Sequence, residues 1–204
     1  MSAYARVATS DTLSDAPAPS LFSRWSSLFR PAPRPSAAEA ARAFSAALRA
    51  QFGAHAPPLC EASFDEAMRS GPAQGRPVLI FLHSELHADA AEFLGAALCT
   101  PEVAAAVAAV NYVVWGGAVH EPSGWEAAMR LEAAAFPFLG VYTPREGNTF
   151  SRVWALEGGP LLGGAELAAV LRHVGGSARE AATRVAALRT AADRERELRE
   201  EQER

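Results

Sequence analysis

Hydrophobic residues along the chain fall into short unbroken runs and into longer stretches with helical spacing. The clearest run is Val78 to Leu82, VLIFL, which follows a Gly-Arg-Pro turn. This run is too short for a helix and lacks the alternation of a strand with one solvated face, so it predicts a strand buried on both faces. Next come a polar loop, residues 83–88, and an alanine-rich helix predicted to start at Asp89, with Glu92 as its capping-box partner.

Helix-start signals occur at several other points of the chain. A serine followed three residues later by a glutamate predicts a capping box at Ser36–Glu39, Ser63–Glu66 and Ser123–Glu126. Thr100 before Pro101 is the pattern of an N-cap followed by proline at the first helical position. Glycines mark predicted helix ends, so we expect the first helix to end at Gly53 and the second to stop before Gly71.

Three further strands are predicted, at residues 110–115, 136–142 and 150–156. A helical crossover makes the first two strands of the chain parallel, and the turn-rich residues 143–148 make the last two a hairpin. This order of elements is that of a thioredoxin-like fold, an α/β fold with a mixed sheet and flanking helices. In that fold a cis-proline introduces the third strand, and Pro137 stands at this position.

The chain is predicted to have three regions: a tail (1–35), a thioredoxin-like domain (36–176) and a charged helix (177–204). Residues 1–20 are small and polar, so they cannot bury enough apolar surface to become ordered. If residues 21–30 are helical, one apolar stripe results: Leu21, Phe22, Trp25, Leu28 and Phe29. Such a stripe fits a helix at a membrane interface, and it equally fits a segment that docks on the domain or on a partner.

The C-terminal residues are predicted to form two helices. The first carries Leu167, Leu171 and Val174 on one face and is closed by Gly175-Gly176. The second begins at Ser177, and its 28 residues contain seven arginines and seven acidic residues. Because its apolar positions form only a thin, interrupted seam, this segment is a weak coiled coil or a rigid spacer.

Composition narrows the classes of function. The net charge of −4 argues against a nucleic-acid partner, which would call for a basic patch. The two cysteines, Cys60 and Cys99, form neither a C-x-x-C motif nor a metal-binding spacing. The N-terminus lacks the apolar core of a secretory signal, although its Ser, Ala and Arg content loosely matches an organelle transit peptide.

The loop after Leu82 decides whether a thioredoxin-like protein can do redox chemistry. Here it reads His83, Ser84, Glu85, Leu86, His87. Because no thiol is present, dithiol exchange is excluded at this position. A metal site of His83, His87 and an acidic residue is an alternative, but Ser84 interrupts the H-E-x-x-H pattern. We therefore expect no catalytic residue, no bound metal and no cofactor.

Several short motifs follow one another in a fixed order: Ala50–Gly53, His55–Pro57, Phe64–Ala67, Val78–His83, Leu98–Val103, Trp115, Phe136–Leu139 and Leu156–Gly158. Together they resemble the UAS domain of UBX-domain adaptor proteins, of the Fas-associated factor 2 type. The similarity extends over about residues 28–200.

This resemblance implies a redox-inactive module in an adaptor of ubiquitin-dependent, ER-associated degradation. Such adaptors bind ubiquitinated clients and recruit the valosin-containing AAA ATPase. They act in the cytoplasm, at the cytosolic face of the endoplasmic reticulum or at lipid droplets. In animal relatives the domain is also associated with long-chain unsaturated fatty acids, so a fatty-acid-responsive membrane-surface protein is the alternative function.

The chain departs from the family pattern at both ends. Its 204 residues contain no ubiquitin-associated helices, no long hydrophobic hairpin and no UBX domain. The charged helix stops mid-pattern at Arg204, which suggests a truncated sequence, and a UBX domain downstream in the intact gene product would establish the adaptor interpretation. Direct binding to the ATPase would depend on that domain.

Overall fold

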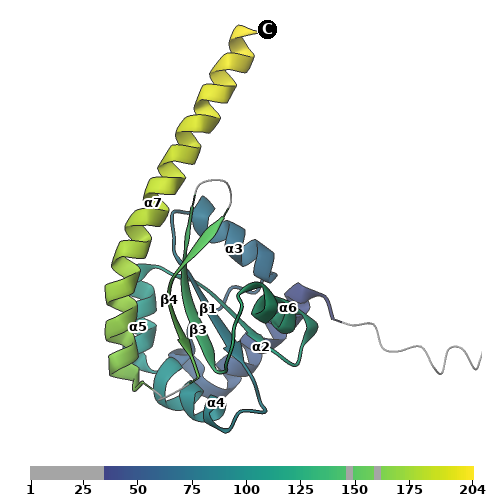
Figure 1. The fold of residues 1–204 in the computed structure, drawn as a ribbon, viewed down its shortest axis with the longest axis vertical. Coiled ribbons are helices and arrows are strands. Elements are labelled where there is room, and N and C mark those ends of the chain that lie inside the picture. Colours follow the sequence, from purple (N-terminus) through teal and green to yellow (C-terminus); the bar gives the residue numbers. More distant parts are fainter. Residues whose placement is uncertain (1–34, 146–148, 159–161) are drawn as a thin grey trace, which may run out of the picture. The chain divides into compact units, whose positions relative to one another are not determined.

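A four-stranded sheet lies at the centre of the described residues, which are 35–145, 149–158 and 162–204 in this computed structural model (Figure 1). Residues 35–204 form one compact unit. The predicted tail, apart from Pro35, lies outside the described residues, and so does its apolar stripe Leu21, Phe22, Trp25, Leu28 and Phe29. Both interpretations of that stripe therefore stay predictions.

The strand order is β2-β1-β3-β4, and the sheet is mixed. β1 pairs with β2 in parallel and with β3 in antiparallel orientation, and β3 and β4 form the hairpin. The elements are α2 (Ala37–Phe52), η1 (Gly53–His55), α3 (Phe64–Ala73), β1 (Val78–His83), α4 (Ala88–Phe93), the π-helical turn η2 (Leu94–Leu98), α5 (Pro101–Val110), β2 (Val113–Ala118), α6 (Pro122–Arg130), β3 (Phe138–Pro144), β4 (Phe150–Glu157) and α7 (Gly164–Gln202).

The run predicted to be a doubly covered strand is confirmed as β1. Leu79 and Phe81 pack into a core with α4, α5 and α7, whereas Val78, Ile80 and Leu82 pack into a second core with α3 and α6. All five side chains are fully buried. Helices on both faces of a mixed sheet in this strand order, with the peptide bond before Pro137 in cis, confirm the thioredoxin-like fold class.

Two of the four predicted capping boxes form, at Ser36 and Ser63, and those at Asp89 and Ser123 do not. The prediction at Ser123 is wrong, because α6 starts two residues earlier, with Glu121 as N-cap and Pro122 in its first turn. Proline suits that position because its fixed φ is already helical and it has no N–H to leave unpaired. The predicted start at Asp89 is one residue late, since α4 begins at Ala88.

Two boundaries between helix and strand differ from the prediction. The predicted second strand starts too early: α5 continues to Val110, Asn111 closes it in the left-handed conformation, and β2 begins at Val113. The second predicted helix end is also wrong, because α3 continues to Ala73. A Cβ at Gly71 would lie 2.5 Å from Val78 Cγ2, so this glycine permits close packing rather than ending the helix.

The largest difference concerns the C-terminus, where one continuous helix, α7, replaces the two predicted helices. The expected break at Gly175-Gly176, and with it the domain boundary at residue 176, falls inside this helix. A Cβ on Gly175 would lie 2.4 Å from Tyr112 Oη and 2.7 Å from Val110 Cγ1. Gly175 therefore allows α7 to approach α5 closely. The helix continues through this glycine because residues before and after it, such as Leu171 and Ala178, are also buried.

No single helix in the described part of the chain is long and apolar enough to span a membrane. The residues 89–98 and 101–110 meet that test only as a pair, bent by 67°.

Candidate functional site

The predicted loop, residues 83–87, lies at the carboxyl end of β1, beside the cis-proline segment. Leu82 is paired with Phe138 in β3, which places Pro137 next to the start of the loop. Because β1 and β2 are parallel, their carboxyl ends meet at the same edge, and His83 is paired with Ala118. In α/β sheets this edge is the usual location of ligand sites.

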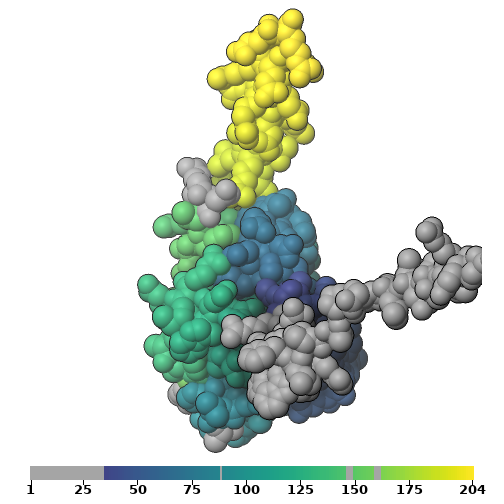
Figure 2. Space-filling view, turned by 90° about the vertical axis from the view of Figure 1, so that its right-hand side faces the viewer, coloured from purple at the N-terminus to yellow at the C-terminus, as the bar shows by residue number. Residues whose placement is uncertain are grey.

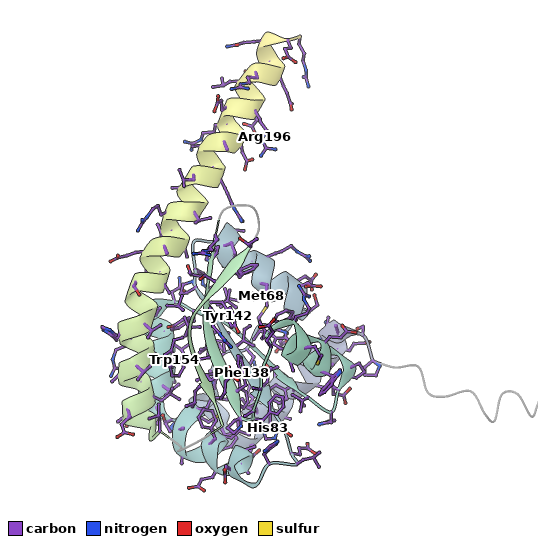
Figure 3. All side chains as sticks on the ribbon, in the orientation of Figure 1. Met68, His83, Phe138, Tyr142, Trp154 and Arg196 are labelled. Carbon is purple, nitrogen blue, oxygen red and sulfur yellow. The ribbon has the colours of Figure 1, made fainter. Side chains whose placement is uncertain are left out.

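His83, labelled in Figure 3, lies half-buried at this edge. Its ring is close to two aromatic rings. Its ring centroid is 6.3 Å from that of Phe44 in α2 and 6.1 Å from that of Phe81. Burial lowers the pKa of His83, while Glu85 raises it and His120 lowers it further. The imidazole is thus neutral at pH 7, and its buried Nδ1 has no hydrogen-bond partner among the described residues.

The remaining loop residues differ sharply in exposure. The side chain of Ser84 is buried, whereas Glu85, Leu86 and His87 are exposed. Leu86 is 95% exposed, which makes it the most exposed large apolar side chain of the described residues. The His87 ring lies 5.8 Å from the Phe136 ring, so the loop also contacts the segment that contains the cis-proline.

A groove of about 340 Å³ extends from the loop across the carboxyl ends of β1 and β2. One wall is the face of α2 that carries Phe44 and Leu48. Sequence reasoning missed the other wall, which includes His120 and Glu121 after β2. The signal was available: because the two strands are parallel, the residues after the second must lie beside those after the first.

Neither cysteine reaches the position where a thioredoxin-like enzyme holds its reactive thiol. Cys99 is buried in the core beneath α5, and burial raises its pKa to about 12, so it carries no thiolate near neutral pH. Cys60 donates its backbone N–H to Val114 O at 2.6 Å, at the β2 edge. Both β2 and β1 thus lie between Cys60 and β3, which follows Pro137.

The alternative of a metal site at the loop finds no support in the geometry. No group of three or more His, Cys, Asp or Glu side chains within residues 35–145, 149–158 and 162–204 is arranged to hold a metal ion. His83 and His87 instead face different neighbours, the first towards Phe44 and the second towards Phe136. The arrangement is a polar-edged apolar groove, suited to holding a partner.

The sequence of this chain is similar to those of several known proteins. No protein-family model matches the chain. Over 91 residues, 45% of the chain, it is 28% identical to FAS-associated factor 2-A of Xenopus laevis and 26% identical to FAS-associated factor 2 of Mus musculus. These matches confirm the resemblance to the Fas-associated factor 2 type. The matched segment covers 20% of each relative, so both relatives are far longer than it.

Two solved structures are similar to the domain. A thioredoxin from Thermus thermophilus aligns with a TM-score of 0.48 and 28% identity, over 55% of this chain and 83% of that one. A DsbH oxidoreductase aligns with a TM-score of 0.48 and 16% identity, over 61% of this chain and 89% of that one.

Proposed function

We propose that this chain is a non-catalytic adaptor module of ubiquitin-dependent protein degradation, which holds a protein partner at the loop of residues 83–87. The observation that carries the proposal is the composition of this loop. At the sheet edge where a thioredoxin-like enzyme needs a thiolate, the chain presents imidazole, hydroxyl, carboxylate and an exposed leucine. A partner can be bound there, but no disulfide can be attacked.

The exposed leucine suggests how a partner would be held. Burying a leucine side chain in an interface contributes about 1.5–3 kcal/mol, which corresponds to roughly tenfold or more in affinity. The adjoining groove adds apolar surface from Phe44 and Leu48, with Glu85 and Glu121 at its edge. This combination of an apolar centre with a polar rim is typical of protein interfaces.

The similarity to Fas-associated factor 2 supports the cellular setting of the proposal. The partners would be ubiquitinated clients and other components of the degradation machinery, with the valosin-containing AAA ATPase recruited through a UBX domain. The expected location is the cytoplasm, at the cytosolic face of the endoplasmic reticulum or at lipid droplets.

The proposal is tested by affinity capture of the tagged full chain from cells, with quantitative detection of ubiquitin conjugates and of the AAA ATPase. We expect Leu86→Glu to reduce recovery of the conjugates about tenfold or more, because a charge replaces the apolar contact. The matched control is Leu198→Glu near the end of α7, where the leucine is also exposed. The control should leave recovery unchanged.

Two outcomes would contradict the proposal. One is recovery of ubiquitin conjugates at the level of the tag alone, or recovery that Leu86→Glu and Leu198→Glu reduce equally. The other is catalysed reduction of insulin disulfides that disappears with Cys99→Ser, since a buried thiol with a raised pKa should give none.

A further inference from the structure

A second cavity, of about 350 Å³, lies at the other end of the sheet, where Tyr142 is paired with Val78 at the start of β1. We name it the Tyr142 pocket. Its apolar lining comes from Phe64 and Met68 of α3 and from Phe150 of β4. Figure 3 shows Tyr142 and Met68 in this part of the molecule, well away from His83. The pocket is thus separate from the groove at residues 83–87.

A bulge in β4 builds the outer wall of this pocket. Val141 is paired with Trp154, and regular alternation would place Val153 opposite Tyr142. The register shifts instead, so that Arg152 is opposite Tyr142. Because β4 has one extra residue here, the side chains of Arg152 and the residues before it point to the opposite face of the sheet from the one that regular alternation would give them. Arg152 and Phe150 therefore line the pocket, while Val153 is left exposed.

The hydroxyl of Tyr142 is the group in this pocket with an unused hydrogen-bond donor. The residue is only 5% exposed, and its buried Oη makes no hydrogen bond of normal geometry with a described residue. Burial raises the pKa of Tyr142 to about 12, so the hydroxyl keeps its proton and acts as a donor at neutral pH. Arg152 lies near enough to lower this pKa, and an arginine can only donate to the hydroxyl oxygen, so the O–H itself has no acceptor. A buried donor without an acceptor destabilises the protein, so a ligand whose acceptor atom bonds to this hydroxyl would gain binding free energy.

Two arginines add donors without adding net positive charge. Arg130 is paired with Asp65 and lies over the Phe64 ring, 5.0 Å from its centroid. Arg152 donates to Glu157 at 2.8 Å. Each guanidinium has five N–H donors, so donors remain after these pairs have formed. Because Asp65 and Glu157 balance the two cations, the guanidinium donors are available to an acceptor that carries no charge.

The acidic groups decide which acceptor fits. Of the charged residues that line the pocket, Arg130 and Arg152 are cationic and Glu132 is anionic. Each arginine is also paired with a carboxylate that does not line the pocket, Asp65 and Glu157, so the pocket has no excess of positive charge. The charges in the pocket therefore do not favour the binding of an anionic ligand. A neutral carbonyl oxygen can accept a hydrogen bond from Tyr142 or an arginine, and the nearby carboxylates do not repel it as they would an anion. A volume of about 350 Å³ with an apolar lining and a few converging polar groups is at the lower end for small-molecule sites.

We propose that the Tyr142 pocket binds a compact, uncharged small molecule that carries a carbonyl or similar acceptor oxygen on an apolar body about the size of an aromatic ring. The apolar part packs against Phe64, Met68 and Phe150, and the oxygen accepts a hydrogen bond from Tyr142. This proposal does not depend on the adaptor function, because the pocket shares no residue with the groove.

Methionine methyl NMR of the full chain tests the proposal, because Met68 lines the pocket and Met129 is an exposed internal control on α6. Three probes share a ring and differ in the head group: acetophenone, benzoate and ethylbenzene. We expect acetophenone to shift the Met68 methyl signal saturably and the Met129 signal hardly at all. Benzoate and ethylbenzene should each bind more weakly, the first because of its charge and the second because it lacks an acceptor.

Tyr142→Phe separates the hydrogen bond from the packing. It should weaken acetophenone binding about two- to tenfold and leave ethylbenzene binding unchanged. The matched control is Tyr112→Phe, since the Tyr112 hydroxyl donates to Leu171 O at 2.9 Å outside the pocket. The proposal would be overturned by a Met68 signal that no probe shifts, by benzoate binding more tightly than acetophenone, or by equal acetophenone affinity of Tyr142→Phe and the unaltered chain.

Discussion

The two halves of α7, residues 164–183 and 184–202, differ in how they contact the rest of the molecule: the first packs on the domain, and most of the second is exposed to solvent. In the first half, a stripe of small and apolar residues is buried against α5 and the sheet: Leu167, Ala168, Leu171, Gly175, Ala178 and Ala182. In the second half, every residue from 191 onward is exposed. Figure 2 shows this last part of the helix, in yellow, extending away from the domain.

Hydrogen bonds follow the same division. Tyr112 and Thr143 donate side-chain hydrogen bonds to main-chain carbonyls of the first half, at Leu171 and Ala178. The second half has ion pairs within the helix, such as Arg199 with Glu195. Exposed pairs of this kind stabilise a helix by only a few tenths of a kcal/mol. Helical periodicity is therefore shared by both halves, but tertiary stabilisation belongs to the first.

The strongest test of this comparison removes one leucine from each half. Leu171→Ala should reduce the free energy of unfolding by about 2–5 kcal/mol, because the side chain is fully buried and leaves a cavity. Leu198→Ala, at a residue that is 58% exposed, should change the free energy by less than about 0.5 kcal/mol. Urea denaturation followed by tryptophan fluorescence measures both. Equal losses would show that the second half also packs.

A smaller effect distinguishes the two adjacent glycines. Gly175→Ala should destabilise the fold by about 1–3 kcal/mol, because the added methyl group would overlap Tyr112 and Val110. Gly176→Ala should stabilise it by about 0.5–1 kcal/mol, because nothing lies within 4 Å of the added Cβ and alanine favours a helix. Thermal unfolding resolves the two signs. If both variants were stabilising, α7 could not approach α5 as closely as described.

The smallest expected effect concerns self-association of the second half. Leu188 and Leu198 are exposed and lie ten residues apart, so they do not form the continuous seam that a coiled coil needs. We expect the full chain to sediment as a monomer at micromolar concentration, with the second half acting as a spacer. A dimer that dissociates on Leu188→Asp would instead favour the coiled-coil interpretation.

The candidate site was only partly accessible to sequence reasoning. Its loop follows an unmistakable buried strand, so the lack of a thiol at residues 83–87 could be read directly. The partners of that loop could not, because His120, Phe44 and Phe136 come from separate parts of the chain. The sheet register brings His120 and Phe136 to this edge, and the packing of α2 brings Phe44 there. The Tyr142 pocket was missed altogether, since a one-residue bulge leaves no clear mark in the local pattern.

The sequence by itself determined the four strands apart from the start of β2, the capping boxes at Ser36 and Ser63, and the chemistry of the loop, because each depends on residues close together in the chain. Tertiary structure decided what the glycines do. Gly71 and Gly175 both look like helix ends, yet each lies within a helix at a point of close packing. The reason is physical: ending a helix at glycine gains little, whereas bringing two elements into contact buries apolar surface from distant parts of the chain.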